Sequence, residues 1–174
     1  MRPLLCICAL IFGTCAFAQG PTPVAKPDDV KSIDSILAAI YGVISNPPGG
    51  KPDWDRFRSL FAANGRLIAV GARGDAAIMH GITPEEYVKL SGPFIEKNGF
   101  IEKEIARRSE QYGNIAEIFS TYESRLKKDD PKPFERGINS FQLFNDGKRW
   151  WIITVLWQNE DKDHPLPEKY LHGG

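Results

Sequence analysis

Residues 134–159, FERGINSFQLFNDGKRWWIITVLWQN, predict two antiparallel strands joined by a tight turn. Apolar and polar side chains alternate along 134–145, and aromatic and β-branched side chains fill 148–159. The dipeptide Asp146-Gly147 between them favours a hairpin loop. Gly137, inside the first strand, predicts a bulge or a bend.

The same period of two continues upstream of this hairpin. It predicts strands over 100–112 and 115–127, with Gly113-Asn114 as their turn and a polar loop over 129–133 before the next strand. Strands of this length must coil, because the twist of a sheet accumulates along them. Residues 100–159 therefore predict one strongly curved antiparallel sheet.

The chain before residue 100 has the spacing of helices, with apolar residues recurring every three or four positions. Thr83-Pro84-Glu85-Glu86 is a strong helix start, since Thr83 can cap and Glu86 can close a capping box. Helices are expected over 28–44, 53–61 and 83–98, a short strand over 66–70 and a loop over 71–81. The order predicts an α+β fold, with three N-terminal helices packed on the concave face of a cone-shaped antiparallel sheet.

The last strand is apolar on both faces from Trp150 to Trp157. A face of an antiparallel sheet that contacts water is normally polar, so both faces of this strand should be covered. Helices cover one face, and a second subunit is the candidate for the other; the alternative is an exposed apolar patch. We therefore expect a homodimer through the outer sheet face.

Residues 1–18 have the features of a cleaved export signal. Arg2 precedes an apolar run, and Ala16-Phe17-Ala18 matches a small-x-small cleavage site. Lipidation at Cys15 is the alternative, for which Phe12-Gly13-Thr14 is a poor lead-in. Cleavage near Ala18 removes all three cysteines, and the mature chain is expected to be soluble and periplasmic or secreted.

Composition limits the remaining organisation and partners. The 174 residues suit one domain, placed at 28–160 between a flexible lead-in over 19–27 and a polar tail over 161–174. The 22 basic and 22 acidic residues balance, which argues against nucleic-acid binding, and no apolar stretch after the signal is long enough to cross a membrane. Neither a metal nor another cofactor is expected, because the domain holds one histidine, no cysteine and no phosphate-binding glycine motif.

The side chains that enter the hollow of the sheet depend on hairpin register. A two-residue loop at Gly113-Asn114 places Glu110 opposite Glu117, and this like-charge pair costs energy. We therefore favour a three-residue loop, which places Glu104 opposite Tyr122. In the last hairpin, two- and three-residue loops pair Asn139 with Thr154 or with Ile153, and both stay open.

In the favoured register, Glu102, Glu104, Ala106 and Arg108 share a face with Ser120 and Tyr122. Glu104 is then a candidate general base beside Tyr122, Arg108 a holder of an anionic ligand group, and Ser120 part of the pocket wall. The alternative is a Glu–Arg pair on a solvated sheet face.

Other candidates lie outside this cluster. His80 is either a catalytic base at the pocket mouth or a loop histidine that caps local backbone. Asn139 and Asn159 are the candidate polar ligand contacts deep in the sheet, and Trp157 is a candidate apolar wall of the pocket.

The arrangement resembles the nuclear transport factor 2-like superfamily, which includes SnoaL-like polyketide cyclases, scytalone dehydratase and ketosteroid isomerase. The resemblance covers 28–160 and rests on the helix order and on four runs of sequence. These are the helix start at 83–87, the run 113–123, and the runs 136–140 and 146–152 of the last hairpin. It implies a cone-shaped sheet around a pocket, usually with a dimer across the outer face.

The resemblance does not carry over a catalytic set. It implies Tyr41 as a hydroxyl donor, but no Asp lies in the last two strands to serve as the second donor of ketosteroid isomerases. We therefore expect a small, largely apolar ligand bound without catalysis. The alternative is an isomerase, dehydratase or cyclase acting on a small polyketide- or steroid-like molecule through Glu104, Tyr122 or His80.

Overall fold

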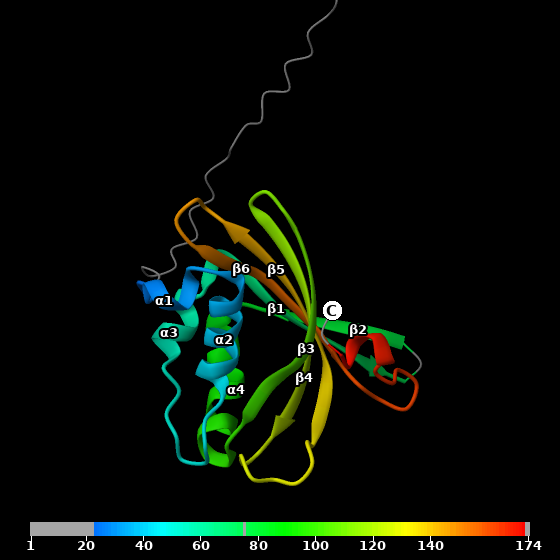
Figure 1. The fold of residues 1–174 in the computed structure, drawn as a ribbon. Helices are drawn as coiled ribbons and strands as arrows, with labels where there is room; N and C mark the ends of the chain where they lie inside the picture. Colours follow the sequence, from blue (N-terminus) through cyan, green and yellow to red (C-terminus); the bar gives the residue numbers. More distant parts are fainter. Residues whose placement is uncertain (1–22, 75, 173–174) are drawn as a thin grey trace, which may run out of the picture.

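The structure, a computed structural model, describes residues 23–74 and 76–172. In this part of the chain an open, curved sheet has helices on one side (Figure 1). The helices are α1 Pro27–Val30, α2 Ile33–Ile44, α3 Trp54–Ser59, α4 Pro84–Asn98 and the 3-10 turn η1 Glu168–Tyr170. The strands are β1 Phe61–Arg73, β2 Ala76–Ile82, β3 Ile101–Tyr112, β4 Ile115–Arg125, β5 Glu135–Asn145 and β6 Trp150–Asn159.

The predicted α+β class and the four long C-terminal strands are confirmed. The sheet order is β2-β1-β6-β5-β4-β3, and the helices cover its concave face (Figure 1). One pair, β1 with β6, is parallel, and the other neighbours are antiparallel. The helical segment between β1–β2 and β3 allows the chain to return to the opposite edge of the sheet.

The prediction of a loop over 71–81 is wrong, because these residues form most of a hairpin. β1 extends to Arg73 and pairs with β2 through Ile82. Gly74 adopts φ +60° in the turn, a conformation that suits glycine. The glycines of this segment predicted a loop, but Gly71 and Gly81 lie within paired strands.

Ser32 divides the predicted first helix into α1 and α2. Its hydroxyl accepts a hydrogen bond from the Ser35 amide at 3.1 Å, and the Ser35 hydroxyl accepts one from the Ser32 amide at 2.9 Å. This capping box satisfies backbone donors at the start of α2. The predicted box between Thr83 and Glu86 is confirmed at α4.

The core lies between the helices and the concave sheet face. It is one cluster in which α2 and α3 meet β1, β4, β5 and β6. Burial of one large apolar side chain stabilises the fold by about 1.5–3 kcal/mol. The fully or almost fully buried members include Ile36, Leu37, Phe57, Leu60, Phe61, Ile118, Phe141 and Ile152.

The β3–β4 hairpin has the two-residue loop that we argued against. Tyr112 pairs with Ile115, and Glu110 lies opposite Glu117. Both glutamates are exposed, so water and salt screen their repulsion. A like-charge pair at the exposed end of a hairpin is therefore too weak to set its register.

Glu104 nevertheless lies opposite Tyr122, as predicted, because Ile105 is an extra residue in β3. This β-bulge shifts the pairing by one residue. It also exchanges the faces beyond it, so Arg107 lies opposite Ser120 and Arg108 opposite Phe119. Arg108 and Ala106 are thus on the outer face, and their predicted place on the pocket wall is wrong.

The β5–β6 hairpin has neither of the registers considered. Its loop spans residues 146–149, and Ile153 is an extra residue in β6. As a result Asn139 lies opposite Trp157. Of the bulge or bend predicted at Gly137, the bulge is wrong, because this residue pairs regularly with both neighbouring strands.

The C-terminal tail crosses the outer face of the sheet, on the side away from the helices (Figure 1). The Thr121 hydroxyl donates to the Tyr170 carbonyl at 2.6 Å, and Arg108 Nε donates to the Lys169 carbonyl at 3.0 Å. The Tyr170 ring packs on Phe119, with centroids 5.4 Å apart. The face that we expected a second subunit to cover is therefore partly covered by the chain itself.

The predicted signal peptide, residues 1–18, lies outside the described residues. Among residues 23–74 and 76–172, no helix has the length and apolar character needed to cross a membrane.

Candidate functional site

A cavity of about 200 Å³ lies between the helices and the concave sheet face. Aromatic and aliphatic side chains form most of its wall, together with two carboxyl groups. No Lys, Arg or His of the described residues lines it. The lining residues are Ile40, Tyr41, Ile44, Phe57, Leu67, Tyr87, Ser91, Phe100, Glu102, Tyr122, Glu135, Asn139, Phe141, Val155 and Trp157.

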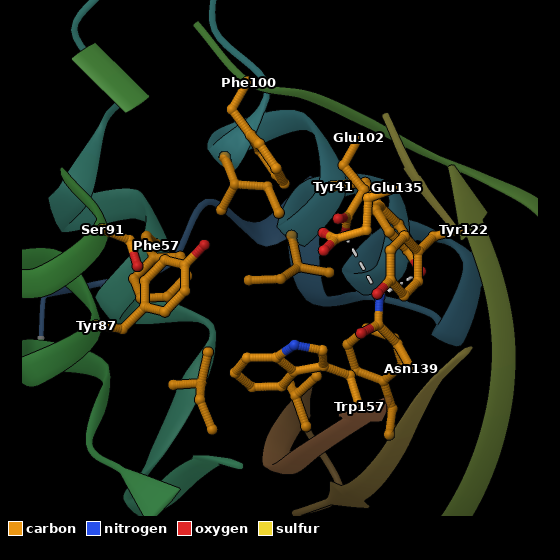
Figure 2. Close-up of a pocket in the computed structure, with 15 residues that line it drawn as sticks. Tyr41, Phe57, Tyr87, Ser91, Phe100, Glu102, Tyr122, Glu135, Asn139 and Trp157 are labelled. Atoms are coloured by element: carbon orange, nitrogen blue, oxygen red, sulfur yellow. Dashed lines mark hydrogen bonds between the residues drawn. The ribbon is translucent and has the colours of Figure 1, made fainter. Parts of the chain in front are cut away.

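The polar side of the cavity is built from rows of residues that lie opposite one another across the strands. Residues opposite each other share a face of the sheet, so each row points toward the helices. Figure 2 shows the polar side chains that reach the cavity gathered on one side of it, across from Tyr87 and Phe57: Tyr41, Glu102, Tyr122, Glu135 and Asn139. The rows are Ser120–Asn139–Trp157, Tyr122–Gly137–Asn159 and Glu102–Ser124–Glu135.

Glu102 is the buried acid of the site. The Ser124 hydroxyl donates to Glu102 Oε2 at 2.8 Å, and Asn139 Nδ2 donates to Oε1 at 3.4 Å. Burial and, to a lesser extent, the nearby Glu135 raise the pKa of Glu102 to about 7, although the two hydrogen bonds act to lower it. A carboxyl with this pKa can hold or release a proton near neutral pH.

The Tyr122 side chain reaches across β5 to β6. It passes over Gly137, which has no side chain to block it. Its hydroxyl donates to Asn159 Oδ1 at 2.5 Å, and the Asn159 amide donates to the Glu135 carboxyl. A Cβ on Gly137 would lie 2.6 Å from the Tyr122 hydroxyl oxygen and 2.4 Å from the Gln158 carbonyl oxygen. Burial raises the pKa of Tyr122, which therefore stays protonated and donates to Asn159.

Behind the cavity wall, a chain of hydrogen bonds runs to the surface. Arg107 Nε donates to Glu104 at 2.6 Å, so this carboxylate acts as an acceptor, and the Ser120 hydroxyl donates to it at 2.5 Å. The Tyr41 hydroxyl must then donate to Ser120, at 2.7 Å, and accept from Asn139 Nδ2, at 3.1 Å. The Glu104–Arg107 ion pair thus sets the direction of every bond in the chain.

This direction fixes how Asn139 faces the cavity. Its amide hydrogens go to Tyr41 and Glu102, and its carbonyl oxygen has no hydrogen bond within the described residues. In Figure 2 that oxygen and the indole nitrogen of Trp157 point into the open space. Trp157 likewise makes no side-chain hydrogen bond to the described residues. Beside the carboxyls, the wall therefore offers a ligand the Asn139 carbonyl oxygen as an acceptor, and the Trp157 indole N–H and the hydroxyls of Tyr87 and Ser91 as donors.

The structure brings most of the predicted site residues together, in two layers. Tyr41, Tyr122, Asn139 and Trp157 line the cavity. A second layer of three predicted residues holds them by hydrogen bonds: Ser120, Glu104 and Asn159.

Two predicted residues lie elsewhere. His80 is exposed on the edge strand β2, opposite Ala69, and does not line the cavity. Arg108 holds the tail on the outer face, and Arg107 takes the expected place beside Glu104.

Two acidic residues of the cavity were given no role by sequence reasoning. Glu102 was placed on the correct face, but its neighbour Glu104 was preferred as the base. Glu135 has the parity of Gly137 and Asn139, so continuing the alternation of β5 by one step would have found it. In the described residues, no group of three or more His, Cys, Asp or Glu is placed to hold a metal ion.

Solved structures share this arrangement of helices and sheet. A candidate ketosteroid isomerase from Parabacteroides distasonis matches 76% of this chain and 91% of its own, with a TM-score of 0.51 and 14% identity. A candidate calcium/calmodulin-dependent protein kinase II association domain from Xanthomonas campestris matches 75% and 86%, with a TM-score of 0.52 and 15% identity. A protein of unknown function with a cystatin-like fold from Nostoc punctiforme matches 75% and 90%, with a TM-score of 0.56 and 12% identity.

The likeness to the candidate ketosteroid isomerase agrees with the superfamily that the sequence resembles. The chain has a nuclear transport factor 2-like fold. No protein-family model and no curated protein matches the sequence. At these identities the likeness of a nuclear transport factor 2-like fold says nothing about chemistry, which must be argued from the cavity itself.

Proposed function

We propose that this nuclear transport factor 2-like protein binds a small, largely apolar molecule in the cavity, with Glu102 as its main polar contact. The supporting observation is a buried carboxyl that makes no ion pair within the described residues, at the wall of an otherwise apolar space. Burying such a group costs free energy, and perturbed carboxyls in cavities are typical of functional sites.

The volume of the cavity limits the size of the ligand. A dry protein cavity of about 150 Å³ is known to hold benzene, whereas pockets for drug-sized molecules measure about 300–1,000 Å³. The present cavity, about 200 Å³, is close to the first case. It suits a molecule with one ring or a short alkyl chain better than the four fused rings of a steroid.

A binding screen with a filled-cavity variant tests this proposal. Thermal shift and NMR against one-ring fragments should give ligands that stabilise the wild-type protein by mass action. Ser91→Phe, on the α4 face that lines the cavity, should abolish the effect, and Leu90→Phe, at an exposed position of the same helix, should retain it. Failure of a broad fragment library to bind the wild-type protein would contradict the proposal.

A second candidate function is acid–base catalysis, favoured by the pKa of Glu102 near 7. Glu102 would take a proton from the carbon beside a carbonyl group and return it to the same or a neighbouring carbon. The hydroxyls of Tyr41 and Tyr122 donate within the protein, so the Trp157 indole N–H and the Tyr87 hydroxyl are left to donate to the carbonyl oxygen. Deuterium uptake by one-ring ketones in D₂O, lost in Glu102→Gln, would support this candidate; no uptake above buffer would exclude it.

We also propose export, with cleavage after Ala18 and Gln19 as the mature N-terminus. N-terminal sequencing of the protein from a periplasmic or secreted fraction tests it. A cytoplasmic protein that begins at Met1 would contradict it.

A homodimer through the outer sheet face remains part of the proposal. The neighbour described as a candidate association domain supports it at the level of the fold. The tail leaves apolar side chains of this face exposed, among them Ile115, Phe144 and Leu156.

A further inference from the structure

The charged groups of the cavity are of one sign. Glu102 and Glu135 line it on either side of Ser124, and the wall contains no basic side chain among the described residues. Two arginines of the same strands, β3 and β5, are engaged elsewhere. Arg107 pairs with Glu104 at 2.6 Å, and Arg136 pairs with Glu160 at 2.8 Å. Two acids therefore lie at the wall of a largely apolar cavity, with no basic side chain of the described residues facing them there.

The carboxyl and amide oxygens that face the cavity are acceptors, and the donors opposite them are neutral: the Trp157 indole N–H and the Tyr87 and Ser91 hydroxyls. The carboxyl oxygens of Glu102 and Glu135 and the carbonyl oxygen of Asn139 border the same space. The hydroxyl hydrogens of Tyr41 and Tyr122 are committed to Ser120 and Asn159. The Asn139 carbonyl oxygen makes no hydrogen bond within the described residues and is open to the cavity, so it can accept a hydrogen bond from a ligand.

The remaining wall is aromatic. Tyr87 stacks on Phe57, with centroids 5.2 Å apart and planes at 20°. Figure 2 shows Tyr87, Phe57 and Trp157 bordering the open space across from the carboxyls. Aromatic faces attract cations through the ring quadrupole, and the attraction is strongest where water is excluded.

We infer that the ligand is a small organic amine, bound as its ammonium ion. This inference rests on the proposed function and adds the charge and polarity of the ligand. The ammonium group has three N–H donors, which match Glu102, Glu135 and the Asn139 carbonyl oxygen. The apolar body of the ligand lies against Trp157 and Tyr87. A carboxylate ligand is disfavoured, since it would face two acids and no basic side chain of the described residues; the available donors, the Trp157 indole N–H and the Tyr87 and Ser91 hydroxyls, are all neutral.

Three ligands of similar shape and different charge test the inference: benzylamine, benzyl alcohol and benzoate. At pH 8, NMR titration that follows the Trp157 indole signal should give a dissociation constant at least tenfold lower for benzylamine than for benzyl alcohol. Benzoate should not bind measurably. Glu102→Gln should weaken benzylamine binding at least tenfold and leave benzyl alcohol binding within about twofold.

Two further variants keep the test decisive. Glu135→Gln repeats the charge removal at the other acid of the cavity, in case Glu102→Gln does not fold. Glu117→Gln removes a charge from the exposed outer face of β4 and should change neither affinity. Equal binding of benzylamine and benzyl alcohol, or tighter binding of benzoate, would overturn the amine inference and leave the proposed function standing. Binding of no fragment at all would overturn both.

Discussion

The Tyr122 hydroxyl donates to the Asn159 amide oxygen at 2.5 Å, although the two residues lie on strands separated by β5. The residue between them in the row is Gly137. Tyr122 can lie across β5 because no side chain stands there. The register of β4, β5 and β6 places Gly137 between Tyr122 and Asn159, and this placement lets Tyr122 take its position in the cavity wall.

Gly137→Ala should destabilise the protein by about 1–3 kcal/mol, the usual cost of overpacking a core. The added methyl would meet the Tyr122 hydroxyl oxygen at 2.6 Å and a backbone carbonyl at 2.4 Å, so the tyrosine or the strand must move. Urea denaturation measures the change. Gly71→Ala is the matched control, because nothing lies within 4 Å of a Cβ at that strand position. An equal, small effect of both substitutions would contradict the close approach.

Asn139→Leu should cost about 1–3 kcal/mol of unfolding free energy, because it removes the donor shared by two buried oxygens. The Tyr41 hydroxyl and the Glu102 carboxyl both accept from this amide. Gln142→Leu, on the same strand but exposed on the outer face, should stay within about 0.5 kcal/mol. If Asn139→Leu lowered the free energy of unfolding no more than Gln142→Leu does, the hydrogen bonds of Asn139 would contribute little to stability.

Stability should depend on pH through Glu102. Its pKa is about 7 in the folded protein and about 4.3 when unfolded, so between these values the folded state binds more protons. The contribution of Glu102 to the free energy of unfolding therefore falls as the pH rises from about 4.3 to 7. Above pH 7 this contribution no longer changes with pH. Carboxyls with a lowered pKa, such as Asp29 and Glu123, act in the opposite direction, so a difference between variants is required.

Glu102→Gln provides that difference. At pH 8 the variant should be more stable than the wild-type protein by up to about 3 kcal/mol, and the gain should shrink toward pH 5. Thermal or urea unfolding across this range measures it, with the exposed Glu117→Gln as control. A constant difference between variant and wild-type protein at every pH would show that Glu102 titrates normally.

The four C-terminal strands could be predicted from the alternation of apolar and polar side chains and from the turn residues. Each of these signals lies within one strand or turn and does not depend on how the strands pair. The hairpin β1–β2 was not predicted, because the three glycines in 71–81 were interpreted as a loop and the short apolar runs between them were too weak a signal for strands. Tertiary pairing decided the conformation there. Gly74 is in the turn, and Gly71 and Gly81 simply occupy strand positions.

The site was harder to predict because two bulges change the parity of their strands. Ile105 exchanges Arg107 and Arg108 between faces, and Ile153 moves Trp157 opposite Asn139. An isoleucine is common at regular strand positions, so the sequence does not identify Ile105 or Ile153 as the extra residue of a bulge. The preference for Glu104 over Glu102 as the base failed for another reason. Both acids lie on the same face of β3, but only Glu102 lines the cavity, whereas Glu104 pairs with Arg107 behind the cavity wall. Where the helices pack on the sheet decides this difference.

Leu156→Glu tests the proposed dimer. Leu156 is an exposed apolar residue on the outer face of β6, and a buried unpaired charge there would oppose association. Light scattering should give twice the mass of one chain for the wild-type protein and the mass of one chain for the variant. Leu90→Glu, on an exposed position of α4, should remain dimeric. A wild-type protein that is monomeric at micromolar concentration would contradict the dimer.

Carboxyl ¹³C NMR titration of Glu102 shows whether this residue is an uncompensated acid on the wall of a ligand cavity. We expect a midpoint near 7 in the free protein, and a lower midpoint when benzylamine is bound. A midpoint near 4.3 in the free protein, unchanged by the amine, would contradict it.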